Sequence, residues 1–171
     1  MKRELSPSAQ VAKIIKKSIT DRGYKCDAKS SNYSMGCSVS VNVYNMPPDV
    51  YKDMDAEFDC YEYGTFDGMT DCSGTKNRDF AGPQTKYLTI TNHNSKELCQ
   101  AAWDIIRTTF SDAMGAPESL EDARSFSVGG EWAPHLVWRM MSARQGDNWS
   151  MSKEFWDTHG AKSTIELKQA A

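Results

Sequence analysis

The stretch NYSMGCSVSVNVY, residues 32–44, decides the fold that we predict. From Cys37 onwards apolar and polar side chains alternate without a break, which is the period of a strand with one buried face. The segment NYSMG before it is rich in turn-forming residues and ends in Gly36. We therefore predict a β-hairpin over residues 24–44, with arms at 24–31 and 37–44. Its open face carries the polar side chains of Ser38, Ser40, Asn42 and Tyr44.

Helical patterns lie on both sides of this hairpin in the sequence. Ser6 and Pro7 suit the start of a helix over residues 7–22, whose apolar positions fall on one face. These positions are Val11, Ile14, Ile15 and Ile19. A second apolar stripe predicts a long helix over residues 95–114, preceded by a β-rich strand at 86–92. A further helix fits residues 48–58, directly after two prolines that end the hairpin.

These elements predict an α+β protein. We expect a small antiparallel sheet, made of the hairpin 24–44 and the strand 86–92, with the helices 7–22 and 95–114 packed on it. Residues 1–115 would form this core domain, and residues 116–171 a helical C-terminal portion. The segment SVGGEW in that portion suggests a glycine hinge between helical segments. Four of the five tryptophans lie between Trp132 and Trp156, where they serve either the core or an interface.

Composition narrows the class of protein. The chain has 171 residues, 39% of them hydrophobic and 25% charged, which is ordinary for a globular protein. No apolar run approaches the roughly 18 residues of a membrane span, and no apolar segment follows the basic N-terminus as in a secretory signal. We therefore expect the protein in the cytosol. Five cysteines without a paired spacing indicate free thiols, and a net charge of −3 gives no global attraction for nucleic acid.

No motif for catalysis or for a cofactor stands out in the sequence. The three histidines, His93, His135 and His159, lie too far apart to form a metal-binding pair of the HxH or HExxH kind. There is no GxSxG motif for a nucleophilic serine and no phosphate-binding loop. We accordingly predict no catalytic residue, no metal and no cofactor.

One segment carries an unusual charge. Between Asp49 and Asp71 eight carboxylates face a single lysine, Lys52. Such a segment can bind a divalent cation, bind in the basic channel of a nucleic-acid-binding protein, or form a solvent-exposed acidic surface that binds nothing. We predict that it binds a partner protein, together with the tyrosines of the open hairpin face. The predicted contact residues are Asp49, Asp53, Asp55, Glu57, Asp59, Glu62, Asp67, Asp71, Tyr33 and Tyr44.

Residues 8–92 resemble a family that phages and plasmids carry. The residues behind this resemblance are the hairpin KSSNYSMGCSVSVNVY, the helix after it, the loop FDGMTD at 66–71 and the strand KYLTIT. In this order they are similar to the large polyvalent protein-associated domain 29. The chain differs in having VYNMPPDV after the second strand, and residues 116–171 have no counterpart in the pattern.

The resemblance implies a protein of a mobile genetic element. Such domains occur in long proteins thought to protect incoming DNA, and no catalytic residue transfers from them. We therefore expect a non-enzymatic counter-defence protein, similar in role to an anti-CRISPR, that inhibits a host immune or nucleic-acid-handling complex. The alternatives are a nucleic-acid-binding accessory protein that uses Lys13, Lys16, Lys17 and the tyrosines, and a metal-dependent enzyme that acts on nucleotides or signalling molecules near Asp67 and Asp71. A structural or accessory virion protein is a further alternative.

Overall fold

The computed structural model describes residues 4–160. Their contacts divide the chain into two compact units. Within the described residues, the first unit consists of residues 4–44 and 52–93, and the second of residues 45–51 and 94–160. The expected division at residue 115 is not the one that these contacts make.

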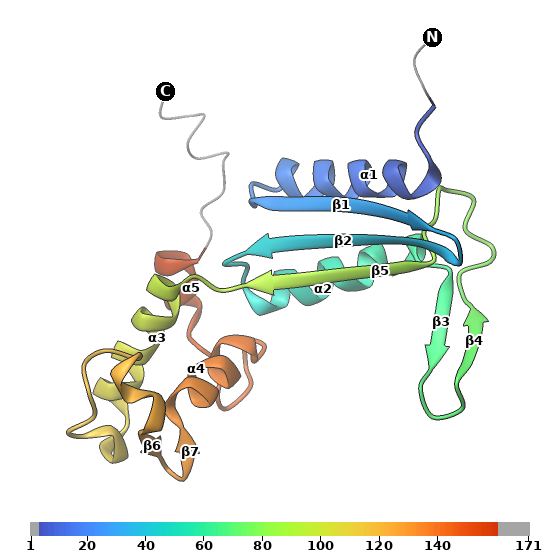
Figure 1. Ribbon diagram of the computed structural model, residues 1–171. Coiled ribbons are helices and arrows are strands. Elements are labelled where there is room, and N and C mark those ends of the chain that lie inside the picture. Colours follow the sequence, from blue (N-terminus) through green and yellow to red (C-terminus); the bar gives the residue numbers. More distant parts are fainter. Residues whose placement is uncertain (1–3, 161–171) are drawn as a thin grey trace, which may run out of the picture. The chain divides into compact units, whose positions relative to one another are not determined.

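A three-stranded sheet forms the centre of the first unit (Figure 1). Strands β1 (Cys26–Tyr33) and β2 (Gly36–Tyr44) make the predicted antiparallel hairpin, and β5 (Tyr87–His93) pairs with the other edge of β2. The alternation is confirmed, because Val39, Val41 and Val43 are all buried. The α+β class predicted from the sequence is confirmed as well.

The pairing of β5 corrects the sequence prediction. We expected an entirely antiparallel sheet, but β5 runs parallel to β2, with Val41 opposite Ile90. The physical reason lies in the connection between the two strands, which spans residues 45–86. A parallel pair needs a crossover of about a dozen residues or more, and this connection is long enough to provide it.

Helix α1 (Pro7–Asp21) packs on β1 and β2 through one face. Val11, Ile15 and Ile19 are fully buried in this layer, whereas Ile14, expected on the same face, is 37% exposed. Helix α2 (Pro48–Phe58) forms where it was predicted and adds Met54 and Phe58 to the buried residues. Its first turn belongs to the second unit, because the contacts assign residues 45–51 there.

The acidic segment folds into a short 3-10 helix and a second hairpin. The 3-10 helix covers Asp59–Tyr61, and strands β3 (Gly64–Asp67) and β4 (Cys72–Thr75) pair antiparallel. In Figure 1 this hairpin points away from the three-stranded sheet at the end where β5 begins, and the turn of the FDGMTD motif joins its two strands.

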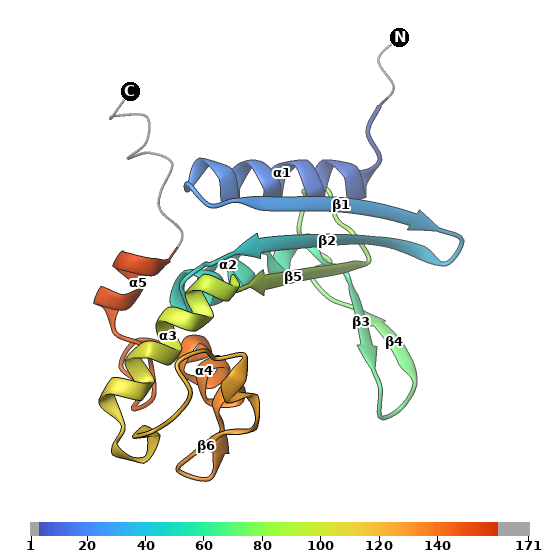
Figure 2. The same cartoon turned by 60° about the vertical axis from the view of Figure 1, so that its left-hand side comes forward.

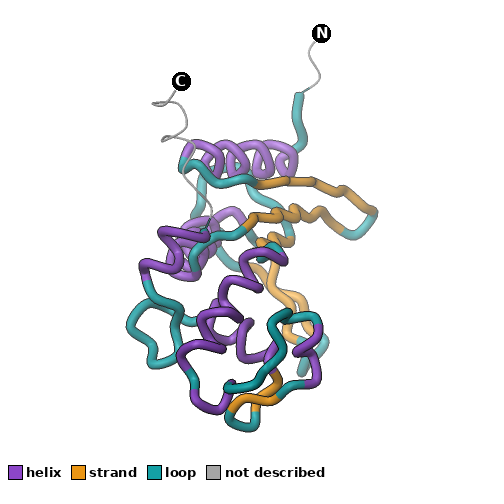
Figure 3. The backbone as a smooth tube through the Cα atoms, turned by 90° about the vertical axis from the view of Figure 1, so that its left-hand side faces the viewer, coloured by secondary structure: helices purple, strands orange, loops and turns teal. Residues whose placement is uncertain are grey.

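The second unit is mainly helical, with α3 (Lys96–Thr109), α4 (Ala133–Ser142) and α5 (Lys153–His159) (Figures 2 and 3). Two 3-10 turns, Ser111–Ala113 and Asp122–Ser125, connect α3 towards α4. The three helices share one core. Its largest side chains are Leu98, Trp103, Ile106, Leu136, Met140, Met141, Phe155 and Trp156.

Two further predictions need correction in this unit. The helix expected over 95–114 to cover the sheet ends at Thr109, and its buried face contributes to the core of the second unit. The glycine hinge in SVGGEW is wrong, because β6 (Ser127–Val128) and β7 (Glu131–Trp132) pair as a hairpin. Gly129 and Gly130 have φ values of 59° and 84° in its turn. Glycine adopts positive φ without steric cost, and two-residue hairpin turns of this kind require it.

Serine side chains cap three helices of the chain. Ser6, Ser95 and Ser152 accept hydrogen bonds from the backbone N–H groups of Ala9, Leu98 and Phe155. Each bond satisfies a donor that the first helical turn leaves unpaired.

Replacing Ser95 by alanine should therefore lower the free energy of unfolding by about 1 kcal/mol, because α3 loses its cap. Chemical denaturation followed by far-UV circular dichroism measures the change. Ser125→Ala, in a 3-10 turn whose N-cap has no side-chain hydrogen bond, is the control. Equal stability of Ser95→Ala and the wild type would show that this hydrogen bond contributes nothing.

Candidate functional site

The structure gives most of the predicted acidic contact residues a partner within the protein. In the second unit, Asp49 accepts a hydrogen bond from the backbone N–H of Gln145 at 3.0 Å and lies 4.0 Å from the Arg144 guanidinium. In the first unit, Glu57 holds Arg22 through both carboxylate oxygens, at 2.7 and 2.6 Å. These two carboxylates therefore connect elements of the fold and are already neutralised by nearby cations.

Lys76 joins two more of these carboxylates. Its ammonium forms ion pairs with Asp59 and, at 2.8 Å, with Glu62. Glu62 also accepts a hydrogen bond from the backbone N–H of Leu88 at 2.8 Å, at the start of β5. Hydrogen bonds from Lys76 and Asn77 hold the pKa of Asp59 below its usual value. This group of charges ties the acidic segment to the sheet edge.

The lowered pKa of Asp59 predicts a dependence of stability on pH. A carboxyl whose folded pKa lies below its unfolded value, about 3.9, contributes stability above that value and loses it as the pH falls through the folded pKa. Asp59→Asn should therefore be less stable than the wild type near neutral pH, and this difference should shrink below about pH 4. Urea unfolding across pH measures it, with Asp71→Asn as a charge-matched control. A difference that stays constant with pH would contradict the role of Asp59.

The remaining predicted acidic residues lie at the surface of the first unit. Asp67 accepts hydrogen bonds from the Met69 N–H at 2.9 Å and from the Thr70 hydroxyl at 2.8 Å, so it shapes the tip of the β3–β4 hairpin. The bond from Met69 is the main cause that lowers the pKa of Asp67. Burial raises the pKa of Asp55, with the nearby charges of Asp59 and Glu62 acting in the same direction. Asp53 and Asp71 are exposed.

The two predicted tyrosines share the face of the sheet that does not carry α1. Tyr33 ends β1 opposite Gly36, and Tyr44 ends β2. They therefore lie at opposite ends of the same face, about 26 Å apart along β2 at the rise of an extended strand. The Tyr44 hydroxyl donates to Asp27 at 3.1 Å, and its ring lies 5.7 Å from that of His93.

The most exposed aromatic group of the second unit lies on α4 and the segments next to it. Helix α4 buries Leu136, Val137, Met140 and Met141 on one face. The opposite face presents His135, Trp138 and Arg139, and Trp132 precedes His135 by three positions. Trp132 is 59% exposed, Trp138 60%, and Trp149 in the loop after α4 47%. We call Trp132, His135, Trp138, Arg139 and Trp149 the tryptophan surface.

Direct contacts join four of these five residues, His135, Trp138, Arg139 and Trp149, through Glu131. The His135 ring stacks on Trp138 at a centroid distance of 5.7 Å, and the Arg139 guanidinium lies 4.8 Å from the centre of the Trp149 ring. Glu131 binds both His135 and Arg139, each at 2.6 Å. The Trp149 ring stacks in turn on Phe110, with 6.1 Å between centroids. Trp138 and Trp149 are thus held in place, which limits the conformational entropy that they would lose on binding.

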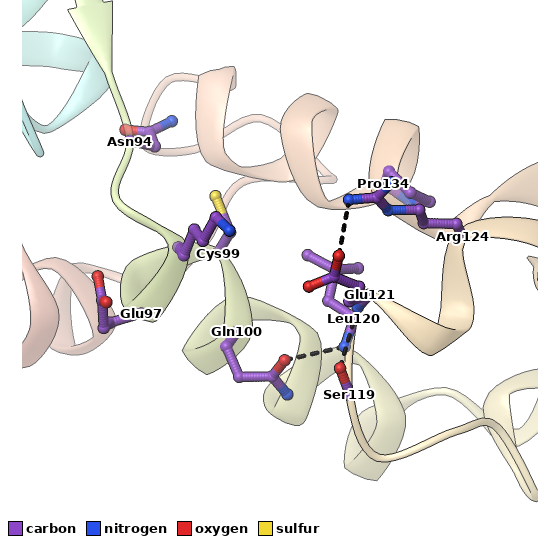
Figure 4. A pocket seen from close by; sticks show the side chains of 10 residues that line it. Asn94, Glu97, Cys99, Gln100, Ser119, Leu120, Glu121, Arg124 and Pro134 are labelled. Carbon is purple, nitrogen blue, oxygen red and sulfur yellow. Dashed lines mark hydrogen bonds and ion pairs between the residues drawn. The ribbon is translucent and has the colours of Figure 1, made fainter.

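A pocket of about 480 Å³ lies elsewhere in the second unit, beside the start of α3 (Figure 4). Most polar side chains that line this pocket already form hydrogen bonds or ion pairs with other groups of the protein. Gln100 accepts from the Leu120 N–H at 2.9 Å, and Arg124 pairs with Glu121 at 3.2 Å. The residues lining it are Asn94, Lys96, Glu97, Cys99, Gln100, Ser119, Leu120, Glu121, Arg124 and Pro134.

Residues 4–160 contain no group of three or more His, Cys, Asp or Glu side chains placed to hold a metal ion. In the same part of the chain, no helix has both the length and the apolar character needed to cross a bilayer. All five cysteines are free thiols, and burial raises the pKa of Cys26 and Cys99. Comparisons with protein-family models, with curated proteins and with solved structures give no match for this chain.

Proposed function

We propose that the protein is a non-enzymatic binding protein that inhibits a host defence or nucleic-acid-handling protein, and that the tryptophan surface makes the contact. The observation that carries this proposal is the exposure of three tryptophans, Trp132, Trp138 and Trp149, on α4 and the segments next to it. Tryptophan and arginine are the residues most enriched among those that dominate binding energy at protein interfaces. Burying a side chain such as Trp138 against a partner would remove a large apolar area from water.

Charge indicates what kind of protein this surface fits. The described residues of the second unit contain eleven Asp and Glu side chains and six Lys and Arg side chains. The acidic character of the unit as a whole favours a basic partner, because carboxylates attract lysines and arginines, and the exposed indole faces can accept their cations. The nucleic-acid-binding face of a protein has this chemistry. The counter-defence setting of this proposal comes from the resemblance of residues 8–92.

A capture experiment tests the proposal. The tagged chain is incubated with lysates of bacteria that carry known defence systems, with and without nuclease, and bound proteins are identified by mass spectrometry. We expect a stoichiometric protein that stays bound after nuclease treatment and is lost with the double variant Trp132→Ser, Trp138→Ser. A protein set that disappears with nuclease would contradict the proposal. Self-association would also contradict it: sedimentation would then show the wild type as a dimer and the tryptophan double variant as a monomer.

A further inference from the structure

Lysine and tyrosine side chains gather on the sheet face of the first unit that α1 leaves uncovered. The strand registers place Lys29 of β1, Ser40 of β2 and Thr89 of β5 in one row across its middle. Lys29, Ser40 and Thr89 are all exposed. This face is therefore a polar platform with a positive charge near its centre.

A lysine lies over a tyrosine ring at each end of this platform. At one end the Lys25 ammonium is 5.3 Å from the centre of the Tyr44 ring, and His93 lies against the same tyrosine. At the other end the Lys86 ammonium is 5.3 Å from the centre of the Tyr87 ring. The Lys86 side chain crosses Gly36 there, where an added Cβ would come within 2.8 Å of its Cδ. Tyr33 stands beside Gly36 and is 47% exposed.

The spacing of these pairs suits an extended polymer. Tyr87 is level with Ser38 and His93 with Tyr44, so six residues of β2 separate the two ends, about 20 Å at the rise of a strand. Lys25 and Lys29 lie on this face, with Asp27 as the anion between them. The Lys86 ammonium, which also donates to the Met35 carbonyl at 3.2 Å, lies at its edge. Ser and Thr hydroxyls fill the intervals, and such groups donate readily to phosphate oxygens.

We infer that this face of the sheet binds a single-stranded nucleic acid, independently of the protein partner proposed above. Lys25, Lys29 and Lys86 would contact phosphates spread along the strand, while the aromatic rings offer stacking partners for unpaired bases. Proteins that bind single strands combine these two features, a positive track for the backbone and aromatic platforms for the bases. The lysines Lys13, Lys16 and Lys17, which the sequence suggested for this role, are exposed on α1, on the other side of the sheet.

Fluorescence anisotropy with labelled oligothymidine and oligouridine tests this inference on the full chain. Three lysines that each neutralise a phosphate predict that log K falls against log salt concentration with a slope of about −2. Lys29→Glu should weaken binding several-fold at low salt and make the slope shallower by about 0.7. Tyr33→Ala should weaken binding about 5-fold or more, because one base loses its stacking partner.

Lys13→Glu is the matched control, because it makes the same change of charge on the opposite side of the sheet. It should bind as the wild type does. The inference is overturned if neither oligonucleotide binds at low salt, if Lys13→Glu and Lys29→Glu weaken binding equally, or if a duplex of the same length binds more tightly. Binding of only one of the two oligonucleotides would support the inference and show which of the two strands this face accepts.

Discussion

Trp103→Ala is expected to lower the free energy of unfolding by about 4 kcal/mol, the largest effect of any single change considered for this chain. Trp103 is fully buried in the core of the second unit. Its indole N–H donates to the Pro117 carbonyl at 3.1 Å, and its ring meets Phe126 edge-on at 6.5 Å between centroids. Alanine would leave a cavity between α3 and the chain that follows it, and would leave that carbonyl without its donor.

Denaturation followed by far-UV circular dichroism checks this value, and Trp132→Ala provides the control. Trp132 is 59% exposed, so its replacement should change the stability by no more than about 0.5 kcal/mol. Trp103→Phe should fall between the two, because it keeps part of the ring volume and loses the hydrogen bond. A change below about 1 kcal/mol for Trp103→Ala would show that α3 does not organise the core of the second unit.

Trp138→Ser is expected to weaken binding of the partner protein by about 2 kcal/mol, which is roughly 30-fold in affinity. Trp138 is 60% exposed, and its ring stacks on His135 next to the ion pair of Glu131 with Arg139. It faces away from the residues that α4 buries, so the fold does not need it. The loss should therefore appear as faster dissociation, with little change in stability.

Surface plasmon resonance with the captured partner measures this effect. Met69→Ser is a suitable control, because Met69 is 96% exposed at the tip of the β3–β4 hairpin. It also removes an exposed apolar side chain, but in the first unit. If Met69→Ser weakened binding as much as Trp138→Ser, the contact would not be specific to the tryptophan surface.

Local patterns allowed much of the fold to be predicted from the sequence. The alternation from Cys37 to Tyr44 is set by the strand period, and one buried face of the sheet enforces it. The start of α1 follows from Ser6 and Pro7, whose capping chemistry acts within a single turn. Interactions within one helical turn or along one strand produce a recognisable residue pattern, and the structure confirms these elements.

Longer-range choices could not be predicted in this way. The strand at Tyr87–His93 has the same β-rich pattern whether it pairs parallel or antiparallel, and only the path of residues 45–86 decides. The stripe on α3 shows that one face is buried but not which residues bury it. In SVGGEW two glycines suit a hinge and a tight hairpin turn equally well, because both need backbone freedom.

In the candidate site, too, local patterns could be predicted from the sequence, whereas contacts between distant residues could not. The charge of residues 49–71 is visible in the sequence, but the cations that neutralise it, Arg22 and Lys76, lie far from their partners along the chain. Counting carboxylates therefore overstated the free charge of that segment. Trp138 did leave a signal, because it falls out of phase with Leu136, Val137, Met140 and Met141 on α4. The contact of Trp149 with Arg139 left none, since a loop of no fixed period brings them together.

Hydroxyl-radical footprinting of the protein, free and bound to its captured partner, tests most directly whether the tryptophan surface is the binding site. Oxidation of each side chain is read by mass spectrometry after proteolysis. We predict that labelling of Trp132, Trp138 and Trp149 falls on complex formation, while labelling of Tyr33 and Met69 stays the same. Unchanged labelling of the three tryptophans, with protection of Tyr33 or Met69 instead, would contradict the account.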